Sequence, residues 1–186
     1  MVKAAKILNI PIYITTQNAA RLGDTVSELT TLLPSPDATP TDPKSMSDTT
    51  PPTLLHDKTA FSMMTPTLLS AVAAQAATAT TTPQPLEIIL VGIETHICVT
   101  QTALDLLSAG HHVYVLADGV SSCNAGERWV ALERLRSRGA TITTSESVLF
   151  ELLGDAKSEA FKAVSALVTK EFKEKTKGAV GAFCAR

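Results

Sequence analysis

A cysteine follows an apolar run in the middle of the chain. Residues 88–91 read Ile-Ile-Leu-Val, and Gly92-Ile-Glu-Thr-His-Ile leads from them to Cys98. Such a run is typical of a strand buried on both faces of a parallel sheet, and residues 99–108 repeat apolar positions at helical spacing. Cys98 is therefore predicted where a helix opens after a strand, which is where open α/β sheets bind ligands. The helix N-terminus favours a reactive thiolate; the alternative is a buried thiol that only fills space.

A lysine is the second candidate. Lys58 stands in the segment His-Asp-Lys-Thr-Ala-Phe-Ser at residues 56–62, where the chain regains order after a proline-rich stretch. A lysine near a thiolate favours the charged sulfur and can donate a hydrogen bond to a carbonyl oxygen. Taken alone, Lys58 is more simply interpreted as a solvated surface charge.

Length and composition limit the possible functions. A chain of 186 residues predicts one domain over residues 1–186. Sixteen basic and eighteen acidic residues argue against nucleic acid as a partner. No apolar run reaches the roughly 18 residues of a membrane span. Three cysteines without CxxC spacing argue against a disulfide framework or zinc site, and a cytoplasmic location fits best.

The elements that must position the two candidates alternate between strands and helices. Strands are expected at 11–15, 88–91, 112–117 and 140–143. Helices are expected at 99–108, at 125–138 with Asn124 as its cap, after Ser145 as the cap of a helix that Gly154 ends, and from about 157. This order predicts an α/β fold with a doubly wound, mostly parallel sheet flanked by helices. Residues 34–53 hold six prolines and eight Ser or Thr, and are expected to form a flexible insertion.

The start of the chain predicts a further strand. Residues 1–9 read as the end of a helix that feeds the strand at 11–15. In a doubly wound fold such a helix crosses over from a preceding parallel strand. The sequence contains no residues for that strand, so the fold is expected to lack its first strand.

Several motifs together resemble one family. They are Lys58-Thr-x-Phe-Ser, Gly92-Ile-Glu-Thr-x-x-Cys98-Val, Val115-Leu-Ala-Asp118-Gly-Val-Ser-Ser and Arg128-Trp-Val-Ala-Leu-Glu-Arg-Leu. In order and spacing they resemble the isochorismatase-like cysteine hydrolase superfamily, and are most similar to the eukaryotic isochorismatase domain-containing proteins. The resemblance covers about residues 2–20 and 54–183.

The resemblance implies acyl-transfer chemistry on a small amide or related metabolite. Cys98 would be the nucleophile that forms a thioester, and Lys58 would polarise the site and stabilise the thiolate. A non-proline cis peptide near Glu94–Thr95 would aim backbone N–H groups at the developing oxyanion. The resemblance also implies a homo-oligomer. No metal or other cofactor is expected, because the four histidines lack the family's metal-binding arrangement.

One departure from the family leaves two interpretations open. The family's catalytic Asp lies in an Asp-x-Gln motif on the first strand, and neither Asp24 nor Asp57 stands where it could replace that residue. The chain is therefore either part of a longer active hydrolase or an impaired homologue that acts as an oligomer subunit or binding protein. A redox module built on the single thiol Cys98 is a third, weaker hypothesis.

The same crevice is expected to hold substrate-binding side chains. Six residues are predicted there: Thr95, Glu94, Phe61, Gln17, Tyr13 and Asp118. Asp118 has a structural alternative as an Asx turn. His96, two residues from Cys98, is either a tuning residue or a partly exposed histidine at the strand end.

Overall fold

The computed structural model describes residues 1–33, 53–77 and 84–169. Its helices and strands are, in chain order, α1 (Val2–Ile7), β1 (Ile12–Gln17), α2 (Ala19–Leu22), α3 (Ser27–Thr30), β2 (Thr53–Lys58), α4 (Pro66–Ala77), β3 (Glu87–Ile93), the π-helix η1 (Thr95–Val99), α5 (Thr100–Ser108), β4 (His112–Ser121), α6 (Ala125–Ser137), β5 (Thr141–Thr143), α7 (Ser145–Leu153) and α8 (Phe161–Leu167). The predicted insertion at 34–53 lies outside the described residues except for Thr53, as does Cys184.

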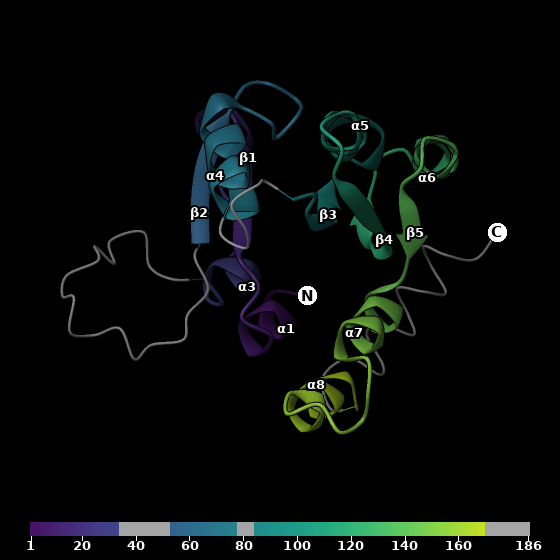
Figure 1. The fold of residues 1–186 in the computed structure, drawn as a ribbon. Coiled ribbons are helices and arrows are strands. Elements are labelled where there is room, and N and C mark those ends of the chain that lie inside the picture. The colour runs from purple at the N-terminus through teal and green to yellow at the C-terminus, as the bar shows by residue number, and fades with distance from the viewer. Residues whose placement is uncertain (34–52, 78–83, 170–186) are drawn as a thin grey trace.

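The strands form two separate parallel sheets. β1 pairs with β2, from Ile12 opposite Thr53 to Gln17 opposite Lys58. The second sheet has the order β3-β4-β5, with both pairs parallel. In Figure 1, β1 and β2 lie with α4 on one side of the view, and β3 to β5 lie on the other. The predicted α/β class with parallel strands is confirmed.

Helices cover both faces of the three-stranded sheet. Side chains alternate along a strand, so Val113, Val115 and Ala117 of β4 share one face. They belong to the main apolar core, which also takes in residues of α5 and α6, such as Leu106 and Leu132. The next helix, α7, contacts β4 as well, and Figure 1 shows α5 and α6 on the opposite side of the sheet from α7. The layers are therefore helix, sheet and helix.

A second apolar cluster joins the first helix to the last two. Ala4 of α1 is fully buried against Leu149 of α7 and Val164 of α8, which are also fully buried. The predicted helix at the start of the chain is confirmed by α1, and this packing fixes it against α7 and α8. No helix in the parts that the structure describes is long and apolar enough to cross a bilayer.

Capping side chains fix where the helices α6 and α7 begin. Asn124 accepts a hydrogen bond from the Gly126 N–H at 3.3 Å, so its predicted capping role at α6 is confirmed. The prediction that Ser145 caps α7 is wrong, because the hydroxyl of Thr144 accepts from the Ser147 N–H. Ser145 bonds instead to Asp118.

A buried arginine fixes the carboxyl end of β4. The pairing of β3 with β4 shifts between Leu90, opposite Val115, and Gly92, opposite Val120, which leaves extra β4 residues without a partner in β3. Arg128 of α6 is only 6% exposed, and its guanidinium donates to the carbonyl oxygens of Ala117, within this irregular stretch, and of Val120, at its end.

Replacing Arg128 is therefore expected to destabilise the fold. In Arg128→Leu the two buried carbonyls lose their donor, which costs about 1–3 kcal/mol of unfolding free energy for each unsatisfied group. Urea denaturation measures the loss. Arg136→Leu is the matched control, because Arg136 is exposed and pairs with the exposed Glu133 one turn away; its effect is expected to stay within about 0.5 kcal/mol. Equal losses in the two variants would contradict this role.

Candidate active site

A buried lysine lies at the carboxyl end of the two-stranded sheet. Lys58 closes β2, and only 6% of it is exposed. Its Nζ donates to Gln17 Oε1 at 2.6 Å and to the carbonyl oxygens of Ala60 at 2.9 Å and Phe61 at 3.0 Å. Gln17 is held in turn, because its Nε2 donates to the Thr59 carbonyl at 2.7 Å. The ammonium is thus fixed between the end of β1 and the loop that follows β2.

The charge of Lys58 is balanced by side chains close to it. Burial lowers the pKa of the ammonium below its usual value of 10.5, while the nearby Cys98 and then Asp57 act in the opposite direction. The three hydrogen-bond acceptors around Nζ are all neutral oxygens. A buried cation is costly without a negative partner, so the thiol of Cys98 is well placed to supply that charge.

Cys98 lies in η1, directly before α5, and is partly buried. A cis peptide precedes this turn at Ile93–Glu94, one bond earlier than predicted. The Thr102 hydroxyl donates to the Cys98 carbonyl at 2.7 Å and accepts from the Met63 N–H at 2.9 Å. Thr102 thereby ties the loop that follows Lys58 to the helix that follows Cys98.

Polar side chains near Cys98 form a connected rim. His96 Nδ1 lies 3.0 Å from the Ser122 hydroxyl and 4.0 Å from Glu94 Oε2. The same Glu94 oxygen accepts from the Cys123 N–H at 2.6 Å. Glu94 and His96 are each about a quarter exposed or less, at 26% and 21%. These groups join η1 to the end of β4 and remain accessible to a bound molecule.

Two of the predicted binding residues are already engaged in the protein. Thr95 is fully buried; its hydroxyl donates to the Ser121 carbonyl at 2.9 Å, and its carbonyl accepts from Thr100 Oγ1 at 2.6 Å. The Asp118 carboxylate accepts from the Ser145 N–H at 2.8 Å and from the Ser145 hydroxyl. Both residues therefore hold the strand ends in position.

The other predicted binding residues divide between two places. Gln17 contacts Lys58 directly, and Phe61 contacts it through the backbone while its side chain is 53% exposed. Tyr13 lines a groove between β1 and β3 instead, and burial raises the pKa of its phenol. The structure thus brings Gln17 and Phe61 to Lys58 and places Tyr13 farther down β1.

Two residues have a role in this arrangement that the sequence analysis does not predict. Thr102 bridges Cys98 and Met63, and its spacing of four residues from Cys98 in a predicted helix was the available signal. Asp57 accepts from the Thr16 hydroxyl at 2.7 Å and from the Ala19 N–H at 3.0 Å. The hydrogen bond from Thr16 is the main reason why the pKa of the Asp57 carboxyl lies below its ordinary value. Asp57 thus fixes the turn after β1.

The chemistry of these groups is that of a thiol beside a buried amine. Such a pair can hold a thiolate and an ammonium together, which is an activated nucleophile. Among residues 1–33, 53–77 and 84–169, no three His, Cys, Asp or Glu side chains gather closely enough to hold a metal ion.

Comparisons with known proteins show which family the chain resembles. The family model of the isochorismatase domain matches residues 1–147. A secreted isochorismatase effector of Phytophthora sojae is 42% identical over 93% of this chain and 73% of its own length. An isochorismatase domain-containing protein 1 of Danio rerio is 36% identical over 90% of this chain, which spans 50% of that relative.

A solved structure shows the same fold. A MAR1 ribonuclease of Caenorhabditis elegans superimposes with a TM-score of 0.73 at 34% identity, over 91% of this chain and 75% of that one. Sequence similarity and fold lead to one conclusion: the chain belongs to the isochorismatase family.

Proposed function

We propose that this chain is a cysteine hydrolase that cleaves a small amide or a related metabolite. Membership of the isochorismatase family supports a hydrolase-type activity. The observation that carries the finer proposal is the buried Lys58 ammonium, which has neutral hydrogen-bond acceptors and interacts electrostatically with Cys98.

The proposed reaction has two steps. The Cys98 sulfur attacks the carbonyl carbon; a C–S bond forms, the C–N bond breaks, and the amine leaves with the proton that the thiol gave up. Because burial makes the neutral amine of Lys58 more accessible, Nζ can take that proton and pass it to the leaving nitrogen. Water then attacks the thioester, which releases the acid and restores the thiol. In the family a first-strand carboxylate assists this transfer.

A ribonuclease activity is the second candidate, because the Caenorhabditis elegans neighbour carries that name. The balanced charge of this chain, formally −2, argues against it, since affinity for RNA depends on basic groups that neutralise phosphates. Incubating the protein with a labelled RNA, alongside a panel of small amides and esters, decides between the two.

The remaining expectations about this protein are proposals of the same kind. We expect a small-molecule substrate, a homo-oligomer, one domain over residues 1–186 and a cytoplasmic location. The name of the Phytophthora sojae relative, a secreted effector, makes location the first of these to test.

Alkylation kinetics test the proposed nucleophile. Cys98 is expected to react with limiting iodoacetamide about tenfold faster than the exposed Cys123, measured by peptide mapping over about pH 5 to 9. Lys58→Met is expected to remove most of that advantage, because the thiolate loses its cation. Lys157→Met, at an exposed position, is the matched control and should leave both rates unchanged.

Turnover completes this test. Any amide hydrolysis is expected to disappear in Cys98→Ala. Slow and equal alkylation of Cys98 and Cys123, unaffected by Lys58→Met, would overturn the cysteine-hydrolase proposal. Turnover that survives in Cys98→Ala would do the same.

The pH dependence of stability tests the burial of Lys58. Folded Lys58 releases its proton at a lower pH than unfolded Lys58, so the unfolded chain binds more protons in the range below pH 10.5. Lys58 therefore makes the free energy of unfolding rise with pH in that range. Urea denaturation at several pH values is expected to show a steeper rise for the wild type than for Lys58→Met. Parallel curves would contradict the burial of a charged lysine.

A further inference from the structure

The ammonium of Lys58 uses every hydrogen bond that it can donate. An ammonium carries three N–H groups, whereas a neutral amine carries two N–H groups and one lone pair. Nζ donates to Gln17 Oε1 and to the carbonyl oxygens of Ala60 and Phe61. Three acceptors therefore match the charged form, and loss of the proton would leave one of these oxygens without an N–H from Nζ.

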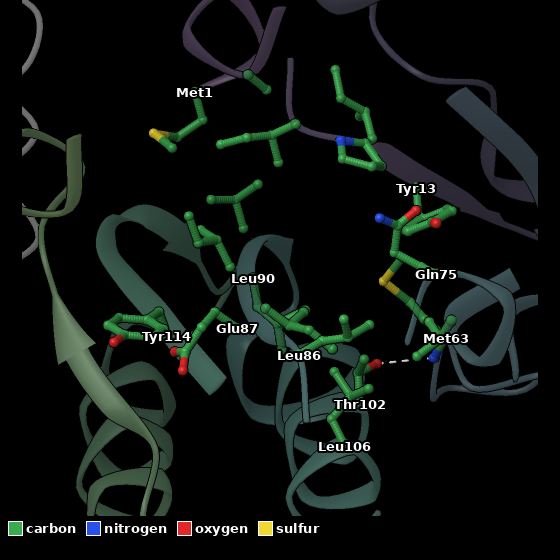
Figure 2. Close-up of a pocket in the computed structure, with 18 of the residues that line it drawn as sticks. Met1, Tyr13, Met63, Gln75, Leu86, Glu87, Leu90, Thr102, Leu106 and Tyr114 are labelled. Carbon is green, nitrogen blue, oxygen red and sulfur yellow. Dashed lines mark hydrogen bonds between the residues drawn. The ribbon is translucent and has the colours of Figure 1, made fainter. Parts of the chain in front are cut away.

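Two of the three acceptors belong to a backbone segment that is held in place. The carbonyls of Ala60 and Phe61 lie in the loop after β2. Farther along this loop, the Met63 N–H donates to the Thr102 hydroxyl at 2.9 Å, and Figure 2 shows this bond beside the groove between β1 and β3. Of the three acceptors, Gln17 alone contributes a side-chain oxygen. It is therefore the acceptor that a substitution can remove.

The amide of Gln17 has one orientation that suits its partners. Gln17 and Lys58 close the parallel strands β1 and β2 and stand opposite each other in the register. While Oε1 accepts from Nζ at 2.6 Å, Nε2 donates to the Thr59 carbonyl at 2.7 Å. A reversed amide would direct its NH₂ group at the ammonium and its oxygen at the Thr59 carbonyl, so both attractions would become repulsions. Thr59 therefore keeps the accepting end of Gln17 toward Lys58.

In the described part of the chain, Cys98 and Asp57 are the titratable side chains that act on the Lys58 charge. Both raise the pKa of the ammonium, against burial, which lowers it. Asp57 precedes Lys58 in β2, so its side chain points to the opposite face of the sheet, where it accepts from the Thr16 hydroxyl at 2.7 Å. Asp57 therefore does not take the place of Gln17 as an acceptor for Nζ.

The number of acceptors influences where the proton of the Lys58–Cys98 pair resides. A thiol beside a neutral amine can transfer its proton to give a thiolate and an ammonium. Only the ammonium supplies an N–H to all three surrounding oxygens, and hydrogen bonds to the charged form of a group favour that form. The Gln17 oxygen thus favours a proton on Nζ and a negative charge on the Cys98 sulfur.

The neutrality of the Gln17 amide matters as well. A carboxylate at this place would also hold the ammonium, but its negative charge would compensate the positive charge of Lys58. The Cys98 thiolate would then face a neutral ion pair and a second negative charge. An amide oxygen accepts the N–H and leaves the charge of Lys58 available to the sulfur.

We propose that Gln17 is a positioning residue that holds the proton of the Lys58–Cys98 pair on Lys58. Its side chain acts through Lys58 and needs no contact with a bound molecule for this role. The inference deepens the proposed hydrolase function and rests on it for its use in catalysis. The charge of Lys58, however, can be measured without any substrate.

Two variants of similar size test this role in the full chain. With ¹⁵N-labelled lysine, the apparent pKa of Lys58 Nζ is measured in the wild type, Gln17→Met and Gln17→Glu. Met removes the acceptor and is expected to lower that pKa by about 1, whereas Glu adds a negative partner and is expected to raise it by about 1. Alkylation of Cys98 by iodoacetamide at neutral pH is expected to slow about tenfold in both variants.

Gln101 provides the matched control, because it lies at an exposed position of α5. Gln101→Met and Gln101→Glu should leave the apparent pKa of Lys58 within about 0.3 of the wild-type value, since exposed charges are screened by solvent. A role of Gln17 in packing alone would not move the pKa of Lys58 in opposite directions in the Met and Glu variants.

Several results would overturn the role of Gln17. They are an unchanged pKa of Lys58 in both Gln17 variants, a shift in the same direction in both, and faster alkylation of Cys98 in Gln17→Glu. Gln17→Glu retains an oxygen acceptor, so an unchanged or lowered pKa in this variant overturns the role even if Gln17→Met does not fold. The predicted pKa shifts in a protein whose Cys98 reacts no faster than Cys123 would support the effect of Gln17 on Lys58 and overturn the hydrolase proposal instead.

Discussion

The arrangement at the carboxyl ends of the strands depends on keeping one ammonium group buried. A buried charge must be surrounded by polar groups or it costs several kcal/mol. Lys58 meets this requirement with Gln17 and with two backbone carbonyls of the loop after β2. These bonds determine the path of that loop, and the loop in turn reaches Thr102 on the helix that follows Cys98. The Lys58 ammonium, which would stabilise a thiolate, therefore also fixes the loop that connects the two-stranded sheet to the three-stranded sheet.

The groove explains why this connection is needed. β1 and β3 face each other without pairing in the described chain, so the sheets meet mainly through loops and helices. In most parallel sheets, ladder hydrogen bonds hold neighbouring strand ends at a fixed separation. Here the distance between Lys58 and Cys98 depends on the bonds of Thr102 and on helix packing.

Much of the fold could be predicted from local sequence patterns. The apolar run at 88–91 and the caps of α6 are local features, and the structure agrees with them. β2 was not predicted, because Thr-Leu-Leu-His-Asp-Lys has only two apolar residues and follows a proline-rich segment. Its strand conformation depends on pairing with β1, which is a tertiary contact. The cap of α7 is Thr144 and not the predicted Ser145, although Ser is the more common cap, because Ser145 is held by its hydrogen bonds to Asp118, a tertiary contact.

The site was predictable only in part. Lys58 and Cys98 are predicted from the sequence, and the structure brings them within electrostatic range, although they stand 40 positions apart in the sequence. The internal hydrogen bonds of Thr95 and Asp118 could not be foreseen, because their partners come from β4 and the turn before α7. The position of Tyr13 away from Lys58 could not be foreseen for a similar reason. Tyr13 borders the groove between β1 and β3, and that groove exists only in the folded arrangement.

The coupling of Lys58 to Cys98 is the central claim, and the titration of Lys58 tests it most directly. With ¹⁵N-labelled lysine, the Nζ resonance of Lys58 can be followed against pH in the wild type and in Cys98→Ala. Because Cys98 raises the pKa of the ammonium against the effect of burial, its removal is predicted to lower that pKa further. The same titration midpoint in both proteins would contradict the account.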